Sequence, residues 1–252
     1  MTHPLDALES SVAYLRTLIE GLDESQYVAS AHPTEWTVAD TMSHLGSGAV
    51  IMKRRFDDIV AGKETPSEFN QSVWDLWNAK TPHAQVTDAL AADQALLERI
   101  LETTPEEREA FVFNLGPLVL DFTGTVGLRL NEHVLHVWDI EEAFNKDATL
   151  QRDAVPFIVD NVELVIKFAG KTTGSGDVLR IRTTEPQREL VLTLGKEAVT
   201  LEDGEKSDDP HDIELPAESF VRLLYGRLDP AHTPAAVESE HLESLRLVFP
   251  GL

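Results

Sequence analysis

The chain has 252 residues, which is long enough to bury a full core as one large domain or two smaller ones. Its 44 acidic residues against 21 basic ones give a formal net charge of −23, which disfavours binding to nucleic-acid phosphates and anionic membranes. It contains no cysteine, no apolar run of the roughly 18 residues that cross a bilayer, and no secretory signal pattern at its start. We therefore expect a cytoplasmic protein that has no thiol of its own and binds neither nucleic acid nor membrane.

Four long segments carry apolar residues at three- and four-residue steps, which is typical of amphipathic helices. They span residues 5–22, 38–60, 82–101, and a last stretch that begins between 119 and 125 and ends near 145. Thr37 followed by Asp40 is a helix-capping pair, and Pro82 after Thr81 is tolerated at a first helical position. These segments predict a helical bundle.

The connections between these helices are less regular. Residues 63–80 predict a short helical piece whose Trp74 and Trp77 pack against the bundle, and residues 106–117 predict a loop with some extended character. Asp153 is expected to cap a fifth helix that Gly170 ends.

The pattern changes after residue 170. A linker-like stretch over 171–176 precedes four short segments that alternate as strands do, at residues 178–182, 190–194, 198–201 and 213–215. Two short helices follow, over residues 217–225 and around 242–248. The fold class is therefore α+β, with a helical bundle over 1–170 and a small antiparallel-sheet domain over 171–252.

The fourth long helix carries a candidate metal site. Glu132 and His136 lie at i, i+4 spacing on one helix face, with Arg129 one turn below. If His44 on the second helix joins them, two imidazoles and one carboxylate would give a metal three ligands and one open position, which is the catalytic arrangement. Asp139 would then orient a ligand imidazole, or it would be an ordinary exposed acid.

Other interpretations of the same residues stay open. His133 offers rival ligand pairs with Glu132 or His136, and Arg129 is either an anion binder beside the metal or an ion-pair partner on the helix surface. A lone histidine at the position of His44 is more often a core or surface residue than a metal ligand. Trp36 and Trp138 are most simply core aromatics. Six further histidines show no partner pattern: His3, His32, His83, His211, His232 and His241.

Two stretches resemble the signatures of a known family. Residues Trp36–Leu45 (WTVADTMSHL) and Glu132–Ile140 (EHVLHVWDI) are similar to those of the mycothiol-dependent maleylpyruvate isomerase family, within the DinB-like metal-binding four-helix bundles. Residues Leu223–Leu228 and Phe249–Gly251 resemble that family's C-terminal domain. The resemblance covers most of the chain, but nothing in it matches a residue set for maleylpyruvate itself.

The resemblance implies a DinB-like four-helix bundle in which His44, Glu132 and His136 hold zinc, with mycothiol as the thiol cofactor and an actinobacterial host. The thiolate would add to a conjugated cis double bond of a small electrophile, or be transferred to another electrophile. The C-terminal domain would close the cleft and offer Arg222 or Arg227 to a carboxylate, with Arg129 as a third catalytic candidate. Arg227 is also explained as a charge at a helix C-terminus.

Two alternatives belong to other functional classes. One is a DinB-like metal-binding protein of stress-response or regulatory type without thiol-transferase activity. The other is a helical domain with no metal, in which Glu132 and His136 belong to a satisfied polar seam. The sequence leaves the electrophile, the native metal and the oligomeric state open.

Overall fold

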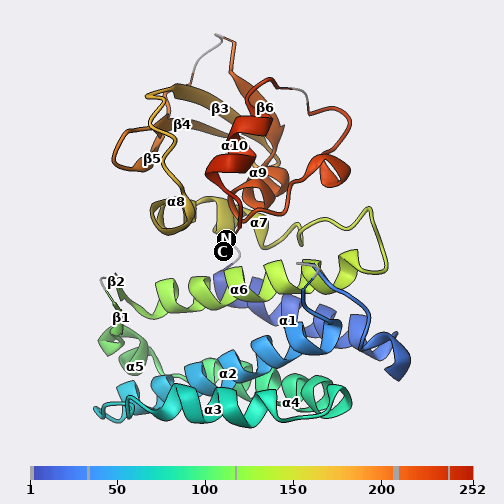
Figure 1. Ribbon diagram of the computed structural model, residues 1–252. Coiled ribbons are helices and arrows are strands. Elements are labelled where there is room, and N and C mark those ends of the chain that lie inside the picture. The colour runs from blue at the N-terminus through green and yellow to red at the C-terminus, as the bar shows by residue number, and fades with distance from the viewer. Residues whose placement is uncertain (1–2, 33–34, 117, 207–209, 238, 252) are drawn as a thin grey trace. The chain divides into compact units, whose positions relative to one another are not determined.

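The computed structural model describes residues 3–32, 35–116, 118–206, 210–237 and 239–251 (Figure 1). The chain divides into two compact units, Met1–Ala148 and Thr149–Leu252. This division falls earlier than the expected boundary at residue 170. Within the described ranges, no helix is both long enough and apolar enough to span a membrane.

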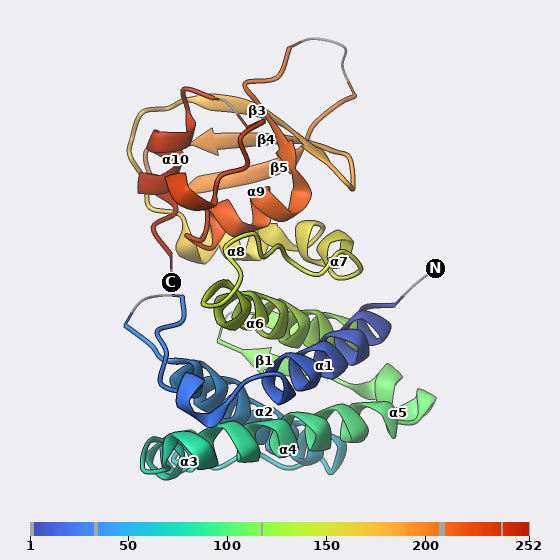
Figure 2. The same cartoon turned by 90° about the vertical axis from the view of Figure 1, so that its right-hand side faces the viewer.

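The first unit is built on four long helices: α1 (Pro4–Glu20), α2 (Val38–Val60), α4 (Pro82–Leu101) and α6 (Phe122–Glu142). Helix α1 packs against α6 and α4, and α2 packs against α4 and α6. Figures 1 and 2 show the pair α1–α6 lying over the pair α2–α4. Apolar side chains from these helices, including Leu15, Met42, Leu45, Val86 and Ile140, form the core. The predicted bundle is confirmed.

Local capping fixes where the site-bearing helices begin. The Thr37 hydroxyl accepts a hydrogen bond from the Asp40 amide at 3.1 Å, while the Asp40 carboxylate accepts one from the Thr37 amide at 3.0 Å. In the same way, Asp121 accepts from the amide of Gly124 at 2.7 Å and starts α6. These caps set the register of every polar side chain that α2 and α6 present to the bundle.

The connections contain more structure than expected. Helix α3 (Phe69–Asn78) buries Trp77, whereas Trp74 is largely exposed, so the prediction that both pack inward was wrong for Trp74. The predicted loop over residues 106–117 overlaps helix α5 (Pro105–Ala110), which was not expected. Its predicted extended character is confirmed by strand β1 (Phe113–Leu115), which pairs antiparallel with β2 (Leu118–Leu120). Short 3-10 turns occur at Glu24–Gln26 (η1) and Pro230–His232 (η2).

The second unit begins with α7 (Val155–Val159) and α8 (Val162–Ala169). One continuous helix capped by Asp153 was predicted here. The structure breaks it because Asn161 has φ −123° and ψ 11°, outside the helical region, and the cap residue of α7 is Ala154. Helix α7 packs against α9 (Ala217–Leu224), and α8 packs against α9 and strand β5 (Val199–Asp203).

The sheet of the second unit consists of β3 (Val178–Thr184), β4 (Arg188–Leu194), β5 (Val199–Asp203) and β6 (Ile213–Pro216), in the order β5-β4-β3-β6. Strands β3, β4 and β5 pair antiparallel, as predicted. Strand β6 pairs parallel to β3, so the sheet is mixed and the prediction of an antiparallel sheet was wrong for this strand. The connection after β5 crosses to the opposite edge, which makes a parallel pairing possible. Helix α10 (Leu242–Val248) closes the chain (Figure 1).

Candidate metal centre

Three donor side chains converge between α2 and α6. His44, Glu132 and His136 each offer a ligand atom, and these atoms all lie within 4.8 Å of one another. The Nε2 atom of His44 is 3.3 Å from Oε2 of Glu132, and the Nε2 atom of His136 is 3.7 Å from the same oxygen. The expected pairing of Glu132 with His136 on one helix face is confirmed, and α2 brings His44 to it.

The spacing of these atoms fits a small divalent cation. Metal–ligand bonds of about 2.0–2.1 Å in a tetrahedron separate neighbouring donors by roughly 3.4 Å. The two separations measured from the Glu132 oxygen, 3.3 and 3.7 Å, bracket that value. Imidazole nitrogen suits zinc, iron or nickel, and the single carboxylate supplies a balancing negative charge. The three side chains could therefore hold one cation, with all of their ligand atoms within 4.8 Å of one another.

Asp139 fixes the orientation of His136. Its side chain is fully buried, and its Oδ2 atom lies 2.8 Å from Nδ1 of His136. A carboxylate at this distance accepts the Nδ1–H proton, so Nε2 is left to face Glu132 and His44. The predicted contact between Asp139 and the His136 imidazole is confirmed, and the interpretation of Asp139 as an exposed acid was wrong.

An indole ring forms one wall of the cluster. The ring centroid of Trp36 lies 6.1 Å from that of His136 with an interplanar angle of 21°, and 5.3 Å from that of His44. Trp36 is only partly buried, so the expectation of a core aromatic was wrong for it. Trp138 is a core residue as expected, and its Nε1 donates to the carbonyl of Ala148 at 2.9 Å.

The carboxyl group of Glu132 is held in its ionised form. Partial removal from water would by itself raise its pKa, but the hydrogen bond with His44 and the charges of His136, His44 and Arg129 outweigh this effect and lower the pKa of Glu132 to about 2. Glu132 therefore presents an anionic donor at neutral pH.

His133 belongs to a different environment from the three donors. Its ring is fully buried, with Nε2 2.8 Å from Oδ2 of Asp93 and Nδ1 2.8 Å from Oγ of Ser11. Both ring nitrogens are thus engaged, and the rival ligand pairs with Glu132 or His136 are excluded. Arg129 is buried beside His133. Its Nη2 atom donates to Oδ1 of Asp93 at 2.7 Å and to the carbonyl of Leu45 at 3.1 Å. Arg129 is thus an ion-pair partner, as one interpretation expected, but it is buried and does not lie on the helix surface.

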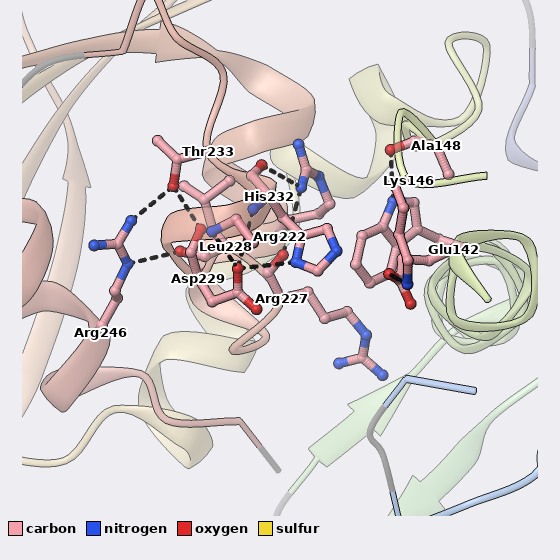
Figure 3. Close-up of polar contacts among 12 residues, drawn as sticks. Glu142, Lys146, Ala148, Arg222, Arg227, Leu228, Asp229, His232, Thr233 and Arg246 are labelled. Carbon is pink, nitrogen blue, oxygen red and sulfur yellow. Dashed lines mark hydrogen bonds and ion pairs between the residues drawn. The ribbon is translucent and has the colours of Figure 1, made fainter. Parts of the chain in front are cut away.

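Arg222 and Arg227 both lie buried in the second unit. Arg222 donates from Nε and Nη2 to the two carboxylate oxygens of Glu218, at 2.8 and 2.9 Å, and from Nη1 to the carbonyl of His232 at 3.0 Å. Arg227 donates from Nη1 to the carbonyl of Tyr225 at 2.9 Å. Figure 3 shows the guanidinium of Arg227 directed away from the Arg222–His232 cluster. Catalytic roles for Arg129, Arg222 and Arg227 stay predictions.

Several of the remaining histidines have acidic partners that the sequence did not indicate. The pairs are His83 with Glu24 at 3.2 Å, His211 with Glu189 at 2.6 Å, and His232 with Asp229 at 2.9 Å. In addition, His32 packs edge-on against Trp138, and the ring of His3 caps α1.

Sequence reasoning also missed Asp93 and Ser11. A signal for Asp93 was present, because it interrupts an otherwise apolar face of α4 formed by Val86, Ala89, Leu96 and Ile100. A charged residue on such a face needs a buried partner. Ser11 gave no comparable signal, since a small hydroxyl is common on a buried helix face.

Comparison with known proteins identifies the family and the fold of this chain. Residues 8–141, more than half of the chain and including all three donors, match the family model described as mycothiol maleylpyruvate isomerase N-terminal domain. Two solved structures are similar in fold, a mycothiol-dependent maleylpyruvate isomerase and its histidine-to-alanine mutant. Each has 15% sequence identity and a TM-score of 0.64, over 90% of this chain and 92% of the other.

No curated protein sequence matches this chain. The structural likeness extends through both units and establishes the fold, and the family model covers the part of the chain that carries the donors. The chain belongs to the mycothiol maleylpyruvate isomerase N-terminal domain family.

Proposed function

We propose that this protein is a zinc-dependent enzyme that uses mycothiol to isomerise a small electrophile or that transfers the mycothiol thiolate to such an electrophile. The observation that carries the proposal is the convergence of His44, Glu132 and His136 within 4.8 Å. Family membership supports the choice of thiol. The lack of cysteine is consistent with it, because sulfur chemistry in this chain requires a bound thiol.

The residues present define what the protein would contribute. Zinc with three protein ligands keeps an open position at which it lowers the pKa of a bound thiol. His44, Glu132 and His136 would hold the ion, and the ionised Glu132 would balance part of its charge. Asp139 keeps Nε2 of His136 directed at the centre, and Trp36 covers one side of both imidazoles. An aromatic wall excludes water from that side and offers an apolar surface to a ligand.

The roles of the two C-terminal arginines can be separated by substitution. We expect Arg222→Ala to destabilise the second unit, because it removes the bidentate ion pair between Arg222 and the carboxylate of Glu218. If Arg227 binds an anionic substrate, Arg227→Ala lowers kcat/KM for anionic electrophiles by about tenfold or more and leaves thermal stability less affected. Equal kcat/KM in Arg227→Ala and the unaltered protein would remove Arg227 from the catalytic candidates.

The proposal is tested by metal content and mycothiol-dependent turnover. Protein purified without chelators should hold about one zinc per chain, and His44→Ala, Glu132→Ala and His136→Ala should each lose it. His83→Ala is the matched control, since His83 is an exposed histidine paired with Glu24. Turnover of maleylpyruvate, or of other small electrophiles, should require both zinc and mycothiol.

The remaining outcomes separate the alternatives. Zinc binding without any response to mycothiol would favour a DinB-like metal-binding protein that is not a thiol transferase. Absence of metal after zinc supplementation would contradict both the mycothiol-dependent enzyme and the metal-binding protein. The third alternative would remain, a helical domain without metal in which Glu132 and His136 are satisfied by hydrogen bonds.

A further inference from the structure

One buried polar network joins all four long helices of the bundle. Ser11 comes from α1, the carbonyl of Leu45 from α2, Asp93 from α4, and Arg129 and His133 from α6. All four side chains are at least 95% buried. None of them is a candidate ligand, yet two of the contacts are made directly beside ligands. Leu45 follows His44 in the chain, and His133 follows Glu132.

Asp93 is the centre of this network. Its Oδ1 accepts from Arg129 at 2.7 Å, and its Oδ2 lies 2.8 Å from Nε2 of His133. Since Arg129 and His133 are one turn apart on α6, binding both with a single carboxylate fixes the rotation of α6 about its own axis. Glu132 and His136 form the neighbouring stripe of the same helix, so their direction is fixed by the same contact.

The network also sets the position of α2. The Nη2 atom that binds Asp93 donates to the carbonyl of Leu45 at 3.1 Å, which attaches α2 next to His44. Helix α4 can approach closely enough because residue 46 is glycine. A Cβ atom there would lie 2.8 Å from Cα of Ala89 and 2.3 Å from the ring of Trp77. Ala89 is one turn before Asp93 on α4. The close approach of α4 to α2 at Ala89 therefore places the Asp93 carboxylate between the helices of the bundle.

The energetics favour a geometric role over a stabilising one. Removing two charges from water costs several kcal/mol per ion, and apolar side chains of similar volume often fill such positions at no loss of stability. A buried carboxylate with two specific partners, in contrast, allows only one relative placement of the helices that carry them. Metal ligands need such placement, because affinity falls when donors are displaced.

We propose that Asp93 is a positioning residue for the metal centre: through Arg129 and His133 it fixes α2 and α6 in the placement that brings His44 to Glu132 and His136. This inference rests on the metal site of the proposed function. It assigns helix α4, which supplies no ligand, a specific part in building that site.

The test compares two buried aspartates of the same unit. Asp58 on α2 is also buried and accepts hydrogen bonds from Arg54 and Thr65 at 2.8 Å, but it lies 14 residues beyond His44, or about 21 Å along the helix axis. Zn²⁺ dissociation constants are measured with a competing chelator for Asp93→Asn and Asp58→Asn, at a temperature at which circular dichroism shows both to be folded. Visible absorption of the Co²⁺-loaded proteins reports the ligand geometry.

We expect Asp93→Asn to weaken Zn²⁺ binding at least about tenfold and to alter the Co²⁺ spectrum. Asp58→Asn should lower thermal stability and leave both readouts unchanged. If Asp93→Asn does not fold, Ser11→Ala, which removes only the partner of His133 Nδ1, should still weaken binding by about threefold or more. Equal Zn²⁺ affinity and equal Co²⁺ spectra in the unaltered protein and the network variant would overturn the inference. Failure of the unaltered protein to bind metal would instead overturn the proposed function.

Discussion

Helix α6 carries two pairs of polar residues at i, i+4 spacing, and the two pairs lie in opposite environments. Arg129 and His133 are buried, and Nη2 of Arg129 and both ring nitrogens of His133 contact Asp93, Ser11 and a backbone carbonyl. Among the described residues, Nε of Arg129 has no hydrogen-bond partner. Glu132 and His136 face a partly exposed cluster in which donor atoms from two helices approach one another. Two pairs of ionisable residues with the same spacing thus differ in role. Arg129 and His133 belong to a buried network, which we call the closed network, and Glu132 and His136 belong to a partly exposed donor cluster, which we call the open cluster.

The difference shows how such pairs can be told apart. In the closed network each carboxylate oxygen faces a hydrogen-bond donor, so a cation has no place there. In the open cluster one glutamate oxygen is shared between two imidazoles, at 3.3 and 3.7 Å. With both imidazoles neutral and their Nε2 atoms unprotonated, the carboxylate and the two nitrogens can direct three lone pairs at one cation.

The largest expected effect concerns the closed network. Asp93→Ala would leave Arg129 buried without its carboxylate partner, and we expect the free energy of unfolding to fall by about 3–5 kcal/mol. Urea denaturation of the metal-free protein measures this change. A loss below about 1 kcal/mol would mean that the buried Arg129 does not depend on Asp93 for its compensating charge.

The open cluster should behave in the opposite way. Glu132→Gln removes the anionic donor, so we expect Zn²⁺ affinity to fall by about 100-fold or more. The side chain is 45% exposed, and the unfolding free energy of the metal-free protein should change by less than about 1 kcal/mol. Calorimetric Zn²⁺ titration and urea denaturation on one preparation check both points. A large loss of metal-free stability in Glu132→Gln would show that the open cluster, like the closed network, is needed for folding, and would contradict the contrast between them.

An intermediate effect is expected at Asp139, which is buried but acts on the open cluster. Asp139→Asn keeps the shape of the side chain and weakens the hold on Nδ1 of His136, so Zn²⁺ affinity should fall by about 10- to 100-fold. Chelator competition measures the affinity, and Asp147→Asn, an exposed aspartate after α6, is the control. Unchanged affinity would show that His136 is oriented by other contacts.

The smallest effect is a dependence of stability on pH. Burial would raise the pKa of Asp93, but the charges of His133 and Arg129 and their hydrogen bonds hold it well below its usual range. A carboxylate whose pKa is depressed by folding contributes stability above its unfolded pKa of about 3.9 and loses it as pH falls further. We expect the metal-free protein to lose stability between pH 5 and about pH 2, and Asp93→Asn to lose less over the same range. Parallel acid-denaturation curves for the two proteins would contradict this assignment.

The sequence was most informative where local rules decide the structure. Thr37 and Asp40 fixed the start of α2, and i, i+4 spacing placed Glu132 beside His136, because capping and helical periodicity depend only on neighbouring residues. Contacts between distant segments were less accessible. The partly exposed stacking of Trp36, the partners of His133 and the parallel pairing of β6 all depend on how separate elements pack. The break at Asn161 could not be predicted, because the apolar spacing on both sides of it favours one continuous helix.

The central claim is that the three donors hold zinc and leave a position for a thiol. X-ray absorption at the zinc edge tests it directly, because the chain has no cysteine to contribute sulfur. The zinc-loaded protein should show a shell of nitrogen and oxygen at about 2.0–2.1 Å, and mycothiol should add one sulfur at about 2.3 Å. A nitrogen and oxygen shell that is identical with and without mycothiol would contradict the account.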